Sequence, residues 1–246
     1  MNYINPPIKA PRNVAHKTYY SQVYNQEIGY NVYLPPDYGE GGERYPVAYH
    51  LHGWTGNESS DIWTLENIYR GRQAITVFPN NSPVIEDRDR LPVESMMIHE
   101  LIPYMDAHYG TNENRTLSGF SMGGGMAFYY AVKYPELFSR VTAYAATFHH
   151  YYQKEYRGVG EPPEKAAALY AAMMKERRYL EEDGILFLVR QNADRIRGNL
   201  LMKIHIGADD VLFCENEIMH AYLNSLDIPH EYKIYPGAGH ELKKIL

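Results

Sequence analysis

The chain of 246 residues has almost no cysteine and no excess of positive charge. Its only cysteine, Cys214, cannot form a disulfide within the chain, and no spacing of Cys and His resembles a zinc finger. Lysine and arginine number 24 against 30 aspartates and glutamates, which gives a formal net charge of −6. Because binding to phosphate backbones needs a basic surface, this balance argues against nucleic acid as a partner.

Long apolar runs are also missing. No window approaches the roughly 18 consecutive apolar residues of a transmembrane helix, so we expect no membrane partner. The opening residues, MNYINPPIKAPRN, have no apolar run after a basic cluster and therefore no secretory signal. This predicts a cytoplasmic protein, with secretion as the alternative if a signal has been removed. No pattern in the sequence indicates an oligomeric state.

Phenylalanine is scarce where tyrosine is abundant, with 7 Phe beside 24 Tyr. Tyrosine combines an apolar ring with a polar tip, which suits wet aromatic surfaces and ligand clefts. Drift in amino-acid usage is the alternative explanation.

The pattern of strands and helices indicates one domain over residues 1–246, since no repeat or long linker divides the chain. Strands are expected at residues 16–24, 27–34, 45–52, 73–78, 115–119, 140–145, 200–206 and 231–235. Helices are expected at residues 92–109, 121–134, 164–180, 185–196 and 215–226. This alternation predicts an α/β fold with a mostly parallel sheet, helices on both faces and an antiparallel N-terminal hairpin.

The segment Gly119-Phe120-Ser121-Met122-Gly123 matches G-x-S-x-G between an apolar strand and a helical pattern. In that setting a sharp turn exposes the serine hydroxyl as a nucleophile, and the helix N-terminus favours developing negative charge. A glycine-rich turn that cradles a phosphate is the alternative, but no lysine follows at P-loop spacing. We therefore predict that Ser121 is the nucleophile.

A nucleophilic serine needs a histidine base and a carboxylate that orients it, and in sheets of this type the acid precedes the histidine in the chain. His240 lies in a glycine-containing loop after the last expected strand. Asp209 and Asp210 directly follow the strand at 200–206, and either fits this order. The pairs at 50/52 and 149/150 are weaker histidine candidates, with a metal site as their alternative. The serine chemistry itself requires no metal and no organic cofactor.

The loop His52-Gly53-Trp54-Thr55-Gly56 follows the strand ending at Leu51, as an oxyanion loop would. Backbone N–H groups of Trp54 and Met122 are the expected donors to the oxyanion.

Together these motifs resemble the α/β-hydrolase esterase family that includes esterase D-type enzymes and the feruloyl and acetyl-xylan esterases of carbohydrate esterase family 1. The resemblance runs through residues 29–36, 45–47, 51–53, 100–104, 118–124, 133–138 and 236–240. It implies the α/β-hydrolase fold and a triad of Ser121, Asp210 and His240, because the family acid stands three residues after the strand-ending glycine, here Gly207. It also implies a small-molecule or oligosaccharide ester as substrate, with feruloyl or acetyl esters of plant polysaccharides preferred.

One segment, at about residues 149–183, departs from simple members of the family. We interpret it as a lid or insertion over the serine, with an ordinary connection carrying one surface helix as the alternative. The residues assigned to a substrate pocket are His52, Trp63, Tyr151 and Tyr152.

Three other functions remain open. S-formylglutathione hydrolase is the alternative within the family, although such enzymes tend to have histidine where this chain has Phe120. An acyltransferase would use the same triad with an alcohol in place of water. A non-catalytic binding protein of this fold would usually lack one member of the triad, and this chain retains all three.

Overall fold

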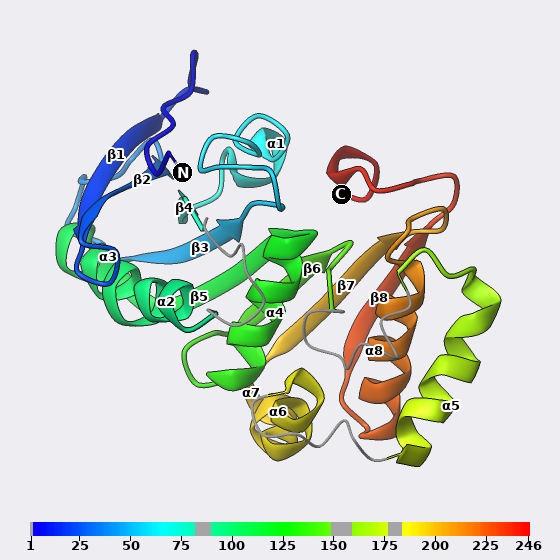
Figure 1. Cartoon of the computed structure of the whole chain (residues 1–246). Coiled ribbons are helices and arrows are strands. Elements are labelled where there is room, and N and C mark those ends of the chain that lie inside the picture. The colour runs from blue at the N-terminus through cyan, green and yellow to red at the C-terminus, as the bar shows by residue number, and fades with distance from the viewer. Residues whose placement is uncertain (1, 82–89, 149–158, 177–183) are drawn as a thin grey trace. The chain divides into compact units, whose positions relative to one another are not determined.

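The computed structural model describes residues 2–81, 90–148, 159–176 and 184–246 (Figure 1). The chain separates into two compact units, which divide between Thr116 and Leu117, and each is described by itself. Strand β5 (Thr111–Phe120) runs across this division.

The first unit is built on the N-terminal hairpin and the strands that follow it. The strands are β1 (Val14–Ser21), β2 (Gln26–Tyr33), β3 (Tyr45–Leu51) and β4 (Ile75–Pro79), with a short helix α1 (Glu66–Tyr69). They pair in the order β1-β2-β4-β3. The predicted antiparallel hairpin is confirmed, with Val14 opposite Tyr33. Strand β2 also pairs antiparallel with β4, whereas β3 and β4 are parallel.

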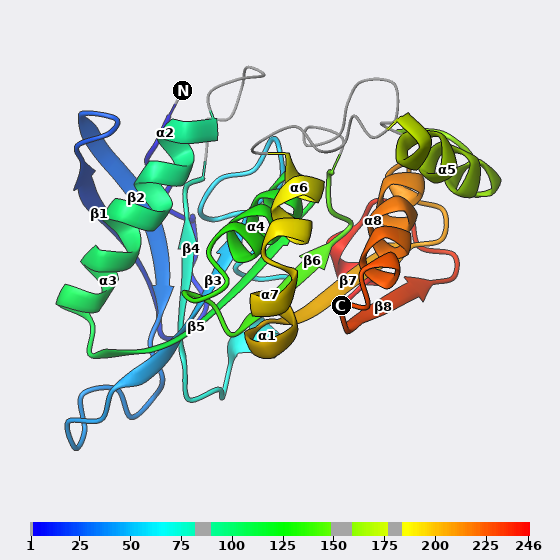
Figure 2. The ribbon, with the colours of Figure 1, turned by 90° about the horizontal axis from the view of Figure 1, so that it is seen from below.

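The helix expected at 92–109 is present but not uniform. It consists of α2 (Arg90–Ser95), a π-helical turn at Met96–Leu101 and α3 (Ile102–His108). The N–H of Ile102 bonds to the carbonyl of Met97, five residues back. Pro103 has no N–H to continue the ordinary ladder, so a change of hydrogen-bond register here costs little. Figure 2 shows this helical run lying along the β1–β2 hairpin.

Many of the tyrosines are core residues. Tyr30, Tyr33, Tyr49 and Tyr222 are among the largest fully buried side chains of the described part. The hydroxyl of Tyr30 lies 2.9 Å from that of Tyr109, and the hydroxyl of Tyr222 donates to a backbone carbonyl at 2.9 Å. Because the hydroxyls of Tyr30 and Tyr222 have partners, burying these two rings carries little desolvation penalty.

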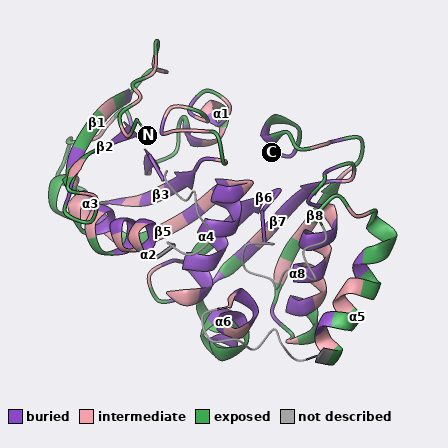
Figure 3. Ribbon diagram, viewed as in Figure 1, coloured by how far each residue is buried: buried purple, intermediate pink, exposed green. Residues whose placement is uncertain are grey.

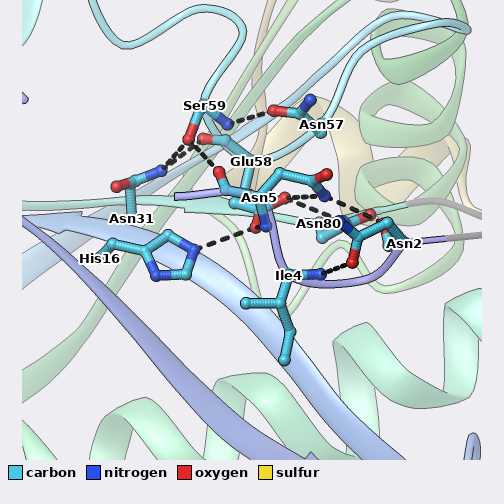
Figure 4. Close-up of polar contacts among 9 residues, drawn as sticks. All are labelled: Asn2, Ile4, Asn5, His16, Asn31, Asn57, Glu58, Ser59 and Asn80. Atoms are coloured by element: carbon cyan, nitrogen blue, oxygen red, sulfur yellow. Dashed lines mark hydrogen bonds and ion pairs between the residues drawn. The ribbon is translucent and has the colours of Figure 1, made fainter. Parts of the chain in front are cut away.

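A buried carboxylate, Glu58, organises one end of the first unit (Figure 4). Its side chain accepts bonds from Asn80 Nδ2 at 2.8 Å, His16 Nε2 at 3.0 Å and both the backbone and side-chain N–H groups of Asn5. Glu58 is only 1% exposed, so these donors replace water around the charge. Room for the carboxylate exists because Gly29 has no side chain: a Cβ there would lie 2.3 Å from Oε1 of Glu58.

We expect the substitution Gly29→Ala to lower the free energy of unfolding by about 1–3 kcal/mol, because the added methyl group would displace the bonded Glu58 carboxylate. Urea denaturation followed by circular dichroism measures this change. Gly110→Ala is the matched control in the same unit, since its Cβ would meet only the Glu43 carbonyl at 3.6 Å. Equal stability of the two variants would contradict the packing argument.

The second unit contains three consecutive parallel strands and the helices that cover them. The strands are β6 (Arg140–Tyr144), β7 (Leu201–Gly207) and β8 (His230–Tyr235). The helices are α4 (Met122–Lys133), α5 (Ala166–Glu176), α6 (Ile185–Gln191), α7 (Ala193–Asn199) and α8 (Phe213–Ser225), with 3-10 turns at Pro163–Lys165 and Leu242–Lys244.

Helices α4 and α8 lie against β6 and β7, and α5 packs on the outside of α8 (Figure 1). Helix α4 is buried along nearly all its length, whereas much of α5 is exposed (Figure 3). Alternating strands and helices behind an antiparallel hairpin confirm the expected α/β class and the mostly parallel strands.

Candidate active site

Ser121 occupies a strained turn between β5 and α4. Its backbone has φ 57° and ψ −118°, a conformation that costs a non-glycine residue about 1–3 kcal/mol. The turn is held from β6, because the Ser121 N–H donates to the Tyr144 carbonyl at 2.9 Å. Such a sharp turn from strand to helix presents the serine side chain away from the sheet.

The glycines around Ser121 allow the strand and the helix to approach closely. A Cβ on Gly119 would lie 2.2 Å from the Gly123 carbonyl oxygen, which is backbone and cannot swing aside. A Cβ on Gly124 would lie 3.0 Å from the Gly119 oxygen and 3.1 Å from that of Tyr144. The small residues of the motif are therefore required by packing.

The second unit brings Ser121, His240 and Asp210 together. His240 Nε2 lies 2.9 Å from Ser121 Oγ, and His240 Nδ1 lies 2.9 Å from Asp210 Oδ2. Since the carboxylate can only accept, Nδ1–H donates to Asp210, and Nε2 is left to accept the serine proton. This is the arrangement in which a histidine acts as general base toward serine.

Asp210 is positioned by its own turn after β7. Its side chain is fully buried, and its Oδ1 accepts the Leu212 N–H at 2.8 Å. Asp209, the other sequence candidate, is exposed, and its N–H donates to the Ala238 carbonyl at 3.0 Å. Only Asp210 has a side-chain hydrogen bond to His240 among the contacts described for these two aspartates.

The acid and histidine loops are attached to each other at Gly207. A Cβ on this residue would lie 2.1 Å from the Ala238 carbonyl oxygen, so only glycine allows the two loops to lie this close. The Ala208 N–H also donates to the Tyr235 carbonyl at 2.9 Å. These contacts set the position of His240 relative to Asp210.

Phe120 packs against His240, a contact that the sequence motif did not indicate. Its ring stacks on the His240 imidazole with centroids 4.8 Å apart and an interplanar angle of 30°. The residue precedes Ser121 directly, so the same turn that holds Ser121 also limits rotation of the His240 ring.

The two predicted oxyanion donors lie in different units. Met122 is the first residue of α4, and the first N–H groups of a helix have no carbonyl partner within it. The helix dipole adds partial positive charge at this end. Trp54 belongs to the first unit, in a turn where the Gly56 N–H donates to the Gly53 carbonyl at 3.0 Å. Its side chain is 53% exposed.

His52, assigned from the sequence to a substrate pocket, is 2% exposed. Its Nδ1 donates to the Gly53 carbonyl at 2.7 Å, and its Nε2 accepts the Asn81 N–H at 3.2 Å. Burial lowers the pKa of His52, which favours this neutral form. The Asn81 side chain bonds to both backbone groups of His52, so the pair fixes the start of the loop that carries Trp54.

The other proposed pocket residues are only partly described. Trp63 is 48% exposed, and its indole N–H donates to the Lys9 carbonyl at 3.0 Å. Tyr151 and Tyr152 lie outside the described residues.

The insertion expected at about 149–183 is described only at residues 159–176. This part is attached to the acid loop, since the Gly160 N–H donates to the Val211 carbonyl at 2.8 Å. The buried Cys214 thiol also donates to the Pro162 carbonyl at 3.2 Å. Burial raises the pKa of Cys214, so the thiol keeps the proton that it donates. The assignment as a lid remains a prediction.

The described ranges contain no group of three or more His, Cys, Asp or Glu side chains placed to hold a metal ion. Within the same ranges no helix has the length and apolar character to cross a membrane.

Comparison with protein families places most of the chain in one group. A family model described as "Putative esterase" matches residues 21–242. An esterase of Mycobacterium tuberculosis (strain H37Rv) is 32% identical over 132 residues, which make up 48% of this chain and 28% of that protein. An endo-1,4-beta-xylanase/feruloyl esterase of Xylanibacter ruminicola is 29% identical over 158 residues, 51% of this chain and 20% of that protein. The chain thus spans less than a third of either relative.

Solved structures share the fold. A ferulic acid esterase superposes with a TM-score of 0.72 at 21% identity, covering 94% of this chain and 92% of that one. An S-formylglutathione hydrolase of Staphylococcus aureus gives the same TM-score, 0.72, at 15% identity, covering 93% and 92%. At these identities the likeness establishes the α/β-hydrolase fold of these enzymes.

Proposed function

This chain belongs to the esterase family described by that model, and from this premise we propose that it is a carboxylic ester hydrolase that acts through a Ser121 acyl-enzyme. One observation carries the proposal: Ser121 Oγ lies 2.9 Å from a histidine nitrogen whose ring is oriented by a buried carboxylate. A serine at its ordinary pKa is a weak nucleophile, so it requires an adjacent base of this kind.

Acylation uses all three side chains. Ser121 Oγ attacks the ester carbonyl carbon while its proton passes to His240 Nε2, and the carbonyl oxygen becomes an oxyanion. Asp210 stabilises the imidazolium that forms and retains its own negative charge. When the tetrahedral intermediate collapses, the bond to the alcohol oxygen breaks and His240 returns the proton to the leaving alcohol.

Deacylation repeats these steps with water. His240 Nε2 takes a proton from water, the resulting hydroxide attacks the acyl carbon, and the bond to Ser121 Oγ breaks. The carboxylic acid leaves, and the serine regains its proton from the imidazolium. These steps use only the three side chains, the ester and water.

We assign the oxyanion to the backbone N–H of Met122 at the N-terminus of α4. The Trp54 N–H stays the second donor predicted from the sequence. Donors of this kind each contribute about 10²–10³ to turnover in comparable sites. The supporting observation is the position of Met122, directly after the nucleophile and at the positive end of a buried twelve-residue helix.

For the substrate we propose a feruloyl or acetyl ester of a plant polysaccharide. The support is the name of one relative, a xylanase/feruloyl esterase, and the ferulic acid esterase among the similar structures. Trp63, Tyr151 and Tyr152 are the aromatic side chains proposed to contact a flat acyl group.

S-formylglutathione is the second candidate, because an S-formylglutathione hydrolase superposes as well as the ferulic acid esterase does. Its thioester would react through the same serine. We expect such enzymes to have histidine where this chain has Phe120, and here the Phe120 ring stacks on His240.

A substrate panel tests the assignment. We expect methyl ferulate to be cleaved with a higher kcat/KM than ethyl acetate, because ring stacking adds binding energy that a methyl group lacks. Acetylated xylan and S-formylglutathione complete the panel. Preference for S-formylglutathione would replace the polysaccharide ester by the second candidate. A ferulate rate no higher than that for ethyl acetate would refute the aromatic contacts.

A further inference from the structure

The segment after β6, residues 145–148, touches the nucleophile directly, and we call it the β6 loop. The Thr147 N–H donates to the Ser121 carbonyl at 3.0 Å, while the Ser121 N–H donates to Tyr144 at the end of β6. Both backbone groups of the strained nucleophile therefore bond to β6 and its loop. Any movement of this loop displaces Ser121.

Helix α8 holds the same loop from its other side. The Glu215 carboxylate accepts the Phe148 N–H at 2.5 Å, and Asn216 Nδ2 donates to the Ala146 carbonyl at 2.9 Å. Glu215 and Asn216 are both 0% exposed. A bond from a backbone N–H to a buried carboxylate is stronger than one between neutral groups, so Glu215 is the firmer of the two contacts.

The start of α8 is bonded to the catalytic acid. The Leu212 N–H donates to Asp210 Oδ1 at 2.8 Å, and the Phe213 N–H donates to the Asp210 carbonyl at 3.0 Å. Asn216 Nδ2 also donates to the Leu212 carbonyl at 2.8 Å. A continuous set of hydrogen bonds thus leads from Asp210 through the first turn of α8 and the β6 loop to Ser121.

A carboxyl group at a fully buried position such as that of Glu215 is costly. Burying a carboxylate requires hydrogen bonds that replace its water, and a neutral residue would avoid the cost. The acyl-enzyme mechanism described above does not use this group. Its bond from the Phe148 N–H places it against the β6 loop.

We propose that Glu215 is a positioning residue of the active site, which holds the β6 loop and thereby keeps Ser121 at its working distance from His240 and Asp210. The inference rests on the proposed function of Ser121. A nucleophile displaced by about 1 Å can lose about 100-fold in rate, so small movements of the β6 loop matter.

The test compares Glu215→Gln with Glu217→Gln. Glutamine keeps the size and one acceptor oxygen but replaces the other carboxyl oxygen by an amide nitrogen. Glu217 is a partly exposed glutamate on the same helix. With p-nitrophenyl acetate we expect Glu215→Gln to lower kcat about ten- to 100-fold and to leave KM within a factor of two. The rate at which a fluorophosphonate labels Ser121 should fall in parallel. Glu217→Gln should match the wild type in both measurements.

A merely structural role gives a different pattern. Glu215→Gln would then lower Tm and yield but keep the wild-type kcat, when the rate is divided by the number of active sites that the fluorophosphonate titrates. That result would overturn the proposal, as would an equal loss in Glu217→Gln. Failure of the proposed function is distinguishable from both, because Ser121 of the wild-type protein would then not be labelled at all. Glu215→Ala serves as a stronger variant, and if it does not fold, the glutamine variant still decides.

Discussion

Replacing Ser121 by alanine should lower kcat for p-nitrophenyl acetate by about 10⁶-fold, the loss seen when a triad serine is removed. Without Oγ no acyl-enzyme forms, and the remaining catalysis comes from the oxyanion donors and binding alone. Initial rates at saturating ester, with protein concentration set by absorbance, measure the effect. Mass spectrometry after fluorophosphonate treatment should show one adduct in the wild type and none in the variant.

The fold should survive this change. Ser121 is held by its backbone N–H and carbonyl, which alanine retains, so the far-ultraviolet circular dichroism and Tm should stay close to those of the wild type. Ser118→Ala, in the preceding strand, is the control for handling and purity. A Ser121→Ala protein that folds and keeps full activity would remove Ser121 as nucleophile and with it the acyl-enzyme mechanism.

The second large effect is expected at the acid. Asp210→Asn should lower kcat about 10⁴-fold near neutral pH, because an amide in place of the carboxylate favours the wrong imidazole tautomer and cannot stabilise the imidazolium. Asp210 is fully buried and 2.9 Å from His240 Nδ1, so solvent does not screen the change. Steady-state kinetics with p-nitrophenyl acetate measure the loss.

Asp209→Asn is the matched control, since it makes the same change one residue earlier. Asp209 is exposed and uses its backbone N–H to bind the histidine loop, a contact that asparagine preserves. We therefore expect its activity to stay within a factor of about two of the wild type. If Asp209→Asn lost more activity than Asp210→Asn, the acid would have to be reassigned.

Local patterns in the sequence predicted the elements that carry the site. The strand, turn and helix around Ser121 were expected because Gly119 and Gly123 are small and the apolar period changes at the serine. The hairpin, the three parallel strands of the second unit and helix α8 followed from the same kind of periodicity. These features depend on residues that are near one another in the chain.

The sequence patterns did not indicate the roles of residues whose partners are distant in the chain. Glu58 bonds to residues 5, 16 and 80, and Glu215 bonds to Phe148, 67 positions away. A single glutamate in a polar stretch is normally a solvated surface residue, so the pattern indicated nothing else. Phe120 is a variable position of the motif, and only its ring contact with His240 gives it a role.

The single cysteine and the lack of long apolar runs argued against an internal disulfide framework and a helical membrane span. The alternation of strands and helices, together with the G-x-S-x-G turn, predicted an α/β fold with serine chemistry. The choice between Asp209 and Asp210 needed either a family resemblance or the folded chain, because both follow the same strand. In the tertiary structure Asp210 bonds to His240, and only the tertiary structure revealed which glutamates are buried. Secondary structure and turns follow from short-range sterics and periodicity, whereas the partner of a buried charge is set by long-range packing.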